Sequence, residues 1–284
     1  MKGASIMTKR TIKLCSVKSL AIFLSVLMIF SLIPATAYAS LFEDTAAESV
    51  VSETSEHSGE IFEDVSRREE NVKHFRLEDG TYMAAQYDTA VHTLDENGEW
   101  QDIDNTLSDS GSEYSTSNAR IKFAKKITGN ESIFTLHENN RKITLSLDGA
   151  IKKTTGVATN TETEFDETAT TLQKMMTLDK LSSRIIYEDI LDGVDLEYIV
   201  VSNNVKENII VKEQKDAYSY SFTLELNNLS ASISATGDVE ITDPNSGEVL
   251  YIIPAPVVYD ANMTYASLTD AYYTLETIGQ KSTA

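Results

Sequence analysis

The stretch Tyr218–Leu226, YSYSFTLEL, alternates apolar and polar side chains at every position. Side chains of a β-strand point alternately to the two faces of a sheet, whereas a helix would spread the five apolar residues around its circumference. Burial of these side chains contributes about 1.5–3 kcal/mol each. The stretch therefore predicts a strand with one buried face and one wet face, and this strand anchors a core.

A second alternating segment follows after Asn227 and Asn228. Leu229, Ala231, Ile233 and Ala235 alternate with three serines in this segment. Because asparagine is a common turn residue, we expect the two segments to pair as neighbours in a meander.

Turn signals separate short apolar segments along most of the chain, which is typical of an all-β protein. These signals are Asp79-Gly80, Asn97-Gly98, Asp148-Gly149, Asp192-Gly193 and Gly237-Asp238. The sequence predicts a mainly β fold of antiparallel sheets, arranged as a sandwich or a meander. At most one or two short helices are expected, one of them over Leu172–Leu181, where apolar residues have helical spacing.

Residues 1–39 have the pattern of a secretory signal peptide. Five basic residues and no acidic one accompany the apolar run Leu20–Ile33, which Pro34 ends. That run is short for a membrane-spanning helix, which needs about 20 apolar residues. Small residues at Ala37 and Ala39 predict cleavage before Ser40, and an uncleaved membrane anchor is the alternative.

Composition divides the remaining chain into four regions. Residues 40–70 are predicted to be an acidic disordered spacer, with a short helix near Glu60–Arg68 as the alternative. Residues 71–150 are predicted to form β-hairpins, and residues 184–284 an antiparallel β region. Residues 151–183 between them are predicted to be a Thr-rich loop with a short helix. Alternatively, residues 71–284 form a single domain.

The chain is strongly acidic. It has 24 basic and 44 acidic residues and a net charge of −20. Removal of the five basic leader residues leaves 19 basic residues against 44. Such a charge disfavours binding to nucleic acid, whose phosphates require Lys and Arg. We therefore expect no nucleic-acid partner. We also expect no stable membrane span once the leader is cleaved.

Cys15 is the only cysteine, so the mature chain has no disulfide, which favours a Gram-positive surface or secreted protein.

A search for reactive groups finds no catalytic, cofactor-binding or metal-binding residue to assign, and no cofactor is expected. The four histidines lack i, i+4 spacing, although His74 and His92 could meet across strands. Two clusters of Asp and Asn are candidate calcium sites, but these residue types are also common in turns. The clusters are Asp95, Asn97, Asp102, Asp104 and Asn105, and Asp189, Asp192 and Asp195.

Trp100, the only tryptophan, follows the Asn97-Gly98 turn. A cross-strand or core aromatic is the favoured interpretation, and stacking on a sugar ring makes Trp100 the candidate glycan contact. Carboxylates are numerous enough that two could meet as in a glycoside hydrolase.

Several ordered motifs resemble one known family. These are FRLEDGTYMAAQYDTAVHTLDENGEWQDIDNTL near the front, IYEDILDGVDLEY at Ile186–Tyr198, NIIVK at Asn208–Lys212 and IPAPVVYD at Ile253–Asp260. They resemble the N-terminal region of the wall-associated, RHS (YD)-repeat and DNRLRE-domain surface proteins of Firmicutes. The resemblance implies a β-rich presentation module and brings no catalytic residue to this chain. The chain itself contains no YD repeat and no DNRLRE motif.

The resulting expectation is a non-catalytic structural or presentation module, not an enzyme, that is secreted or held at the Gram-positive cell surface. Its expected partners are the rest of a larger surface protein or the cell wall, and glycans. A carbohydrate-binding module for wall or host glycans is the alternative function, followed by a glycoside hydrolase-like enzyme.

Overall fold

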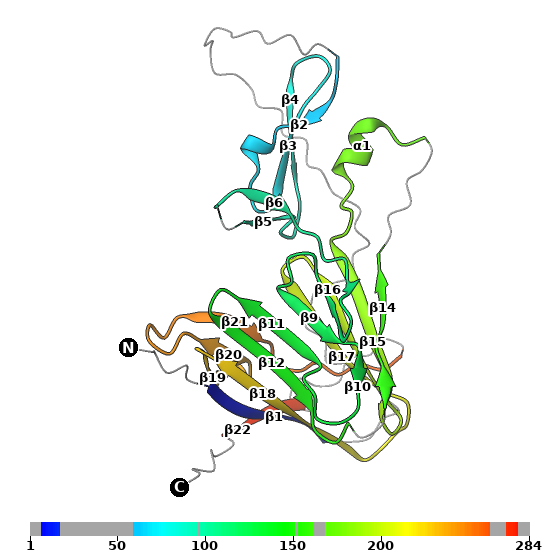
Figure 1. Cartoon of the computed structure of the whole chain (residues 1–284), viewed down its shortest axis with the longest axis vertical. Coiled ribbons are helices and arrows are strands. Elements are labelled where there is room, and N and C mark those ends of the chain that lie inside the picture. Colours follow the sequence, from blue (N-terminus) through cyan, green and yellow to red (C-terminus); the bar gives the residue numbers. More distant parts are fainter. Residues whose placement is uncertain are drawn as a thin grey trace. The chain divides into compact units, whose positions relative to one another are not determined.

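A computed structural model describes residues 7–17, 59–95, 97–150, 153–161, 168–261 and 271–277 (Figure 1). Strands dominate these residues, and the strand pairs are antiparallel; one short α-helix and one 3-10 turn accompany them. The predicted fold class is therefore confirmed.

The chain divides into two compact units. The larger unit comprises residues 1–30, 106–160 and 183–284, and the smaller unit comprises residues 31–105 and 161–182. These boundaries differ from the predicted ones, because residues 106–150 belong with the C-terminal strands while the segment that includes the short helix belongs with the early hairpins.

The larger unit contains an eight-stranded sheet in the order β22-β1-β18-β12-β11-β9-β8-β7. Its strands are β1 (Met7–Val17), β7 (Ser108–Asp109), β8 (Glu113–Ser115), β9 (Ile121–Ala124), β11 (Phe134–Glu138), β12 (Arg141–Leu147), β18 (Ala217–Asn227) and β22 (Ala271–Thr277).

Three smaller sheets complete this unit, in the orders β14-β15-β16-β17, β19-β20-β21 and β10-β13. Their strands are β14 (Val157–Asn160), β15 (Ser182–Leu191), β16 (Val194–Val201), β17 (Asn204–Val211), β19 (Ser230–Ile233), β20 (Val239–Thr242), β21 (Val249–Ile253), β10 (Lys126–Ile127) and β13 (Thr154–Thr155).

The smaller unit is built from two small sheets, β2-β3-β4 and β5-β6. Its elements are β2 (Phe62–Glu63), the 3-10 turn η1 (Val65–Arg67), β3 (Val72–Arg76), β4 (Tyr82–Gln86), β5 (His92–Leu94), β6 (Trp100–Asp102) and the helix α1 (Thr171–Met176). Thr170 caps α1 through a reciprocal capping box with Gln173. The core of this unit has Phe75 at its centre, with Leu172 and Met176 packed against it.

Strand β18 confirms the buried face expected of the alternating stretch. Its five apolar side chains are all buried, and Leu226 has no exposed surface. The opposite face is half-buried rather than fully wet, since Ser221 and Thr223 donate hydrogen bonds of 2.9 and 3.1 Å to the Asp148 carboxylate.

The predicted pairing of β18 with the segment after it is wrong. β18 pairs with β12 on one side and β1 on the other, while β19 pairs with β20 in a separate sheet. Asn228 has a φ of 56°, the left-handed region that asparagine tolerates. After this residue the chain leaves the large sheet and continues into β19, which pairs with β20.

Strand β1 lies in the segment that the sequence predicts as the basic part of a leader. It pairs with β18 from Met7↔Asn227 to Val17↔Ala217 and with β22 on its other side (Figure 1). The apolar run and the predicted cleavage residues Ala37, Ala39 and Ser40 lie outside the described residues. Within the described part of the chain, no helix is long and apolar enough to cross a membrane.

The predicted spacer also contains ordered elements in its described part. β2 pairs with β3, and η1 follows it at Val65–Arg67, within the stretch where a short helix was the alternative. Arg68 forms an ion pair with Glu63, five positions away, and with Asp102, 34 positions away; the second contact is long-range and cannot be seen from composition.

Beside the core of the larger unit lies a carboxyl group, that of Glu207, with no basic partner among the described residues. Glu207 of β17 lies opposite Tyr198 of β16, whose hydroxyl donates a 2.6 Å hydrogen bond to Glu207 Oε2. Burial raises the pKa of Glu207 to about 7, and the hydrogen bond from Tyr198 opposes the shift only partly.

We expect Phe222→Asp to abolish cooperative folding of the larger unit, because Phe222 is 4% exposed and an aspartate there would bury an unpaired charge. Ser221→Ala removes one hydrogen bond from Asp148, which keeps its bond from Thr223, and should cost about 0.5–1.5 kcal/mol. Thermal unfolding followed by circular dichroism compares the two variants. Equal melting temperatures would contradict the strand assignment.

Glu207 should make the larger unit less stable as the pH rises from about 5 to 8. The folded chain keeps the Glu207 proton up to a pKa of about 7, whereas the unfolded chain loses it near the ordinary value of 4.5, so the loss amounts to about 2–3 kcal/mol. Urea unfolding of the wild type and Glu207→Gln, followed by tyrosine near-ultraviolet circular dichroism, isolates this contribution. A difference between the two proteins that stays constant with pH would refute it.

Candidate functional site

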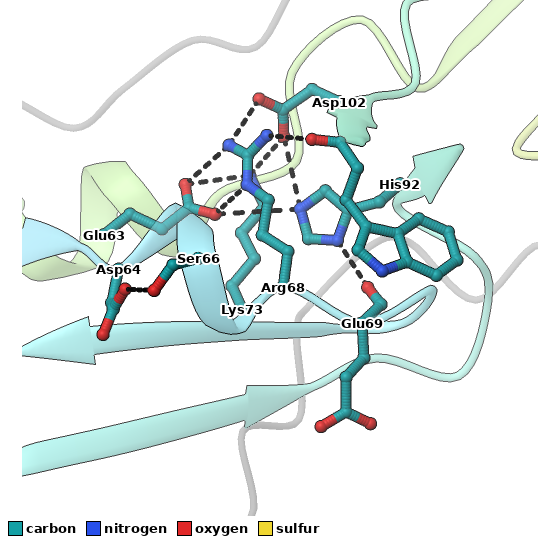
Figure 2. A network of polar contacts seen from close by, with 9 residues as sticks. Glu63, Asp64, Ser66, Arg68, Glu69, Lys73, His92 and Asp102 are labelled. Atoms are coloured by element: carbon teal, nitrogen blue, oxygen red, sulfur yellow. Dashed lines mark hydrogen bonds and ion pairs between the residues drawn. The ribbon is translucent and has the colours of Figure 1, made fainter. Parts of the chain in front are cut away.

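The strongest concentration of charged side chains in the smaller unit is a polar cluster of Glu63, Arg68, Lys73, His92 and Asp102 (Figure 2). Each member comes from a different local element. Glu63 ends β2, Arg68 follows η1, and Lys73 lies on β3. His92 and Asp102 are cross-strand partners on β5 and β6. Strand pairing and the turn η1 thus bring together residues up to 39 positions apart.

Arg68 links the two carboxylates of the cluster. Its Nε donates to Glu63 Oε1 at 2.6 Å, and its Nη2 donates to Glu63 Oε2 at 3.1 Å and to Asp102 Oδ2 at 2.9 Å. The Arg68 side chain is only 9% exposed. Its hydrogen bond to Glu63 raises the pKa of the guanidinium, although burial acts in the opposite direction. The planar guanidinium is well suited to such a bidentate contact.

Lys73 completes the charge balance from the buried face of β3. Its Nζ donates a 2.8 Å hydrogen bond to Asp102 Oδ1 and lies 3.9 Å from Glu63 Oε2. Burial acts to raise the pKa of Asp102, but the hydrogen bond and charge of Lys73, together with the charge of Arg68, outweigh it and hold that pKa below its ordinary value. Two cations therefore neutralise two carboxylates.

His92 lies at the closed end of the cluster with no exposed surface. Its Nδ1 lies 2.6 Å from the backbone carbonyl oxygen of Glu69, so Nδ1 carries the proton and donates it. Burial lowers the pKa of His92, which keeps the ring neutral at pH 7. Nε2 then points its lone pair toward Glu63 Oε1 and Asp102 Oδ1, at 3.7 and 3.6 Å, and has no hydrogen-bond partner among the described residues.

The polar cluster can accept a proton at His92, but both of its cationic side chains are already paired with carboxylates. Protonation of His92 at Nε2 would form ion pairs with both carboxylates. The Arg68 and Lys73 charges are already neutralised, so neither is available to a phosphate group. Asp102, whose side chain is 55% exposed, is the member most accessible to solvent.

The structure separates the candidate residues that the sequence singled out. His74 and His92 do not meet: both lie near Glu69, His74 beside its carboxylate and His92 beside its backbone carbonyl. His57 lies outside the described residues. Trp100 is half-buried opposite Leu94 in the β5–β6 pair, and its role as a glycan contact stays a prediction.

The two Asp-rich clusters are used for other contacts. Asp95 accepts backbone hydrogen bonds within its own turn, and Asp102 belongs to the polar cluster. Asp189 and Asp195 share Lys212, whose Nζ lies 2.9 and 2.7 Å from them. Among the described residues, no group of three His, Cys, Asp or Glu side chains could hold a metal ion.

Glu63, Arg68 and Lys73 were not found by sequence reasoning. Glu63 and Arg68 lie in a stretch predicted to be a spacer, and no motif joins them to Asp102. The one available signal was Lys73, which shares a strand face with the apolar Phe75 at i, i+2; a lysine on an apolar face implies a buried acidic partner.

Comparison with known proteins finds relatives named as tRNA nucleases. The chain is 27% identical over 280 residues to the tRNA3(Ser)-specific nuclease WapA of Bacillus spizizenii, which covers 90% of this chain and 11% of that protein. It is 27% identical over 269 residues to the tRNA(Glu)-specific nuclease WapA of Bacillus subtilis subsp. natto, covering 86% of this chain and 11% of that protein. The tRNA nuclease WapA of Bacillus subtilis is 26% identical over 268 residues, with the same coverage.

The chain thus spans about a tenth of the length of these relatives. No protein-family model matches it, and no solved structure matches it.

These names correct several expectations from the sequence. The relatives are named as nucleases, which contradicts the expectation of a non-catalytic surface module that is not an enzyme, and they give no better support to its glycan-binding and glycosidase alternatives. The inferred resemblance to RHS-repeat and DNRLRE wall proteins is likewise overturned. The expectation of no nucleic-acid partner is wrong because the relatives are named for tRNA. It rested on net charge, a property of the whole chain that does not exclude a local or separate RNA-binding surface.

Replacement of Lys73 by methionine should destabilise the smaller unit by about 1–3 kcal/mol, because Glu63 and Asp102 would then share one cation. Lys180→Met is the matched control: Lys180 is 57% exposed and lies 3.7 Å from Asp104, so its loss should cost less than about 1 kcal/mol. Urea unfolding followed by Trp100 fluorescence reports on this unit. Equal losses would show that the cluster does not stabilise the fold.

Proposed function

We propose that this chain is a segment of a nuclease that cleaves tRNA. The observation that supports the proposal is the similarity to three tRNA nucleases along 86–90% of the chain. Such a length of similarity covers both compact units and not one isolated motif.

The proposal extends to tRNA as a class and not to one tRNA. Two of the relatives are named for different tRNAs, a serine and a glutamate acceptor, yet each is 27% identical to this chain. Similarity in this region therefore does not distinguish between these substrates.

The polar cluster by itself does not carry the proposal. It contains a histidine, carboxylates and cations, the residue types that acid–base cleavage of a phosphodiester uses. In the described arrangement, however, His92 is fully buried and both cations are paired. The proposal accordingly assigns no catalytic residue.

Export is part of the proposal. The basic segment, the apolar run and the small residues at Ala37 and Ala39 support a secreted or surface-located protein. A mature N-terminus at Ser40, read by sequencing the protein recovered from the culture medium, would support export, and a cell-retained protein that begins at Met1 would argue against it.

The complete gene product should convert full-length tRNA into two fragments when it is incubated with unfractionated tRNA. A denaturing gel displays the fragments, and mapping of their ends identifies the cleavage position. Ribosomal 5S RNA in the same reaction is the control and should stay intact. An undegraded tRNA pool at the highest enzyme concentration would refute the proposal.

A further inference from the structure

The larger unit contains a cavity of about 670 Å³ between its sheets. Strands β9, β11, β12, β18 and β22 of the eight-stranded sheet line it, together with β16 and β17 and, from the third sheet, β20 and β21. Protein interiors are close-packed, with few voids larger than a water molecule. A cavity of this size matches instead the range of about 300–1,000 Å³ that is typical of small-molecule sites.

The cavity wall is mainly apolar. Phe134 and Tyr198 form a stacked aromatic pair at 6.0 Å between ring centroids, and the rest of the wall consists mainly of aliphatic side chains from β9, β11, β12, β17, β18, β20 and β21. Val249 and Ile252 also line the cavity and are 43% and 55% exposed, so the apolar lining reaches the protein surface. An apolar ligand can therefore enter along an apolar path.

Glu207 is the unbalanced charge of the cavity. The other charged lining residues, Arg120 and Glu138, lie 3.3 Å apart and neutralise each other. Glu207 receives only the Tyr198 hydroxyl, and no cation among the described residues pairs with it. The Glu207 side chain is partly exposed and not fully enclosed, and it lines the cavity.

We propose that this cavity binds a largely apolar molecule that carries one cationic amine, with the amine paired to the Glu207 carboxylate. An ammonium group would supply the missing counter-charge beside a mainly apolar wall, where such a pair is stronger than in bulk water. A carboxylate ligand would meet like charge at Glu207, and a neutral ligand would leave the carboxylate unpaired. The inference is independent of tRNA cleavage, since it concerns only this cavity.

The test is isothermal titration calorimetry at pH 7.5 with n-decylamine, n-decanol and decanoate, each below its micelle concentration. Decylamine should bind the wild-type protein at one site, more tightly than decanol and decanoate. Glu207→Gln keeps the hydrogen-bond acceptor for Tyr198. This variant should lower the affinity for decylamine at least 10-fold and leave the affinity for decanol unchanged. Glu188→Gln, which removes an exposed carboxylate from β15, should bind decylamine like the wild type.

Leu136→Trp fills the cavity from β11 and should abolish binding of all three molecules. Circular dichroism establishes whether this variant folds, and the Glu207→Gln comparison decides the matter if it does not. No binding of decylamine to the wild type would overturn the proposal. Equal binding by the wild type and Glu207→Gln, decanoate binding as tight as decylamine binding, or binding retained in a folded Leu136→Trp variant would each overturn it as well.

Discussion

The larger unit depends on one strand that contributes to two cores. The first half of β18 places Tyr218, Tyr220 and Phe222 in the main core with the β15–β16 strands, and its second half places Leu224 and Leu226 in the core formed with β19 and β20. A strand of eleven residues is long enough to serve both, because each residue advances the chain by about 3.3 Å. Loss of β18 would therefore expose the inner faces of three sheets at once.

The sequence predicted the faces of strands better than their neighbours. Alternation at Tyr218–Leu226 depends only on which side of the strand is buried, and the burial agrees at all five apolar positions. Which strand pairs with which depends on contacts between residues distant in sequence. β12, which pairs with β18, lies about 75 residues before it, whereas β19, which directly follows β18, pairs with β20 in another sheet. The same limit hid the polar cluster, whose members no local pattern connects.

Buried charge is handled differently in the two units. In the smaller unit, Glu63 and Asp102 face Arg68 and Lys73, so the cluster closes on itself and His92 stays neutral. In the larger unit, Glu207 accepts a hydrogen bond from the Tyr198 hydroxyl but has no cationic partner in the described part of the chain, and burial raises its pKa. A cluster whose positive and negative charges cancel can stabilise a fold without a ligand. A carboxylate beside a cavity that lacks a cationic partner can instead form an ion pair with a cationic ligand.

Residues 7–17 cannot serve two purposes in the same mature molecule. As β1 they pair with β18 along eleven positions and separate it from β22. As the basic part of a cleaved leader they would be removed with the apolar run, which would leave the facing edges of β18 and β22 without that strand. Unpaired strand edges attract other strands, so cleavage would require β18 and β22 to pair with each other or with another segment. Cleavage before Ser40 and the eight-stranded sheet with β1 are therefore mutually exclusive: a cleaved chain would have to complete that sheet without β1.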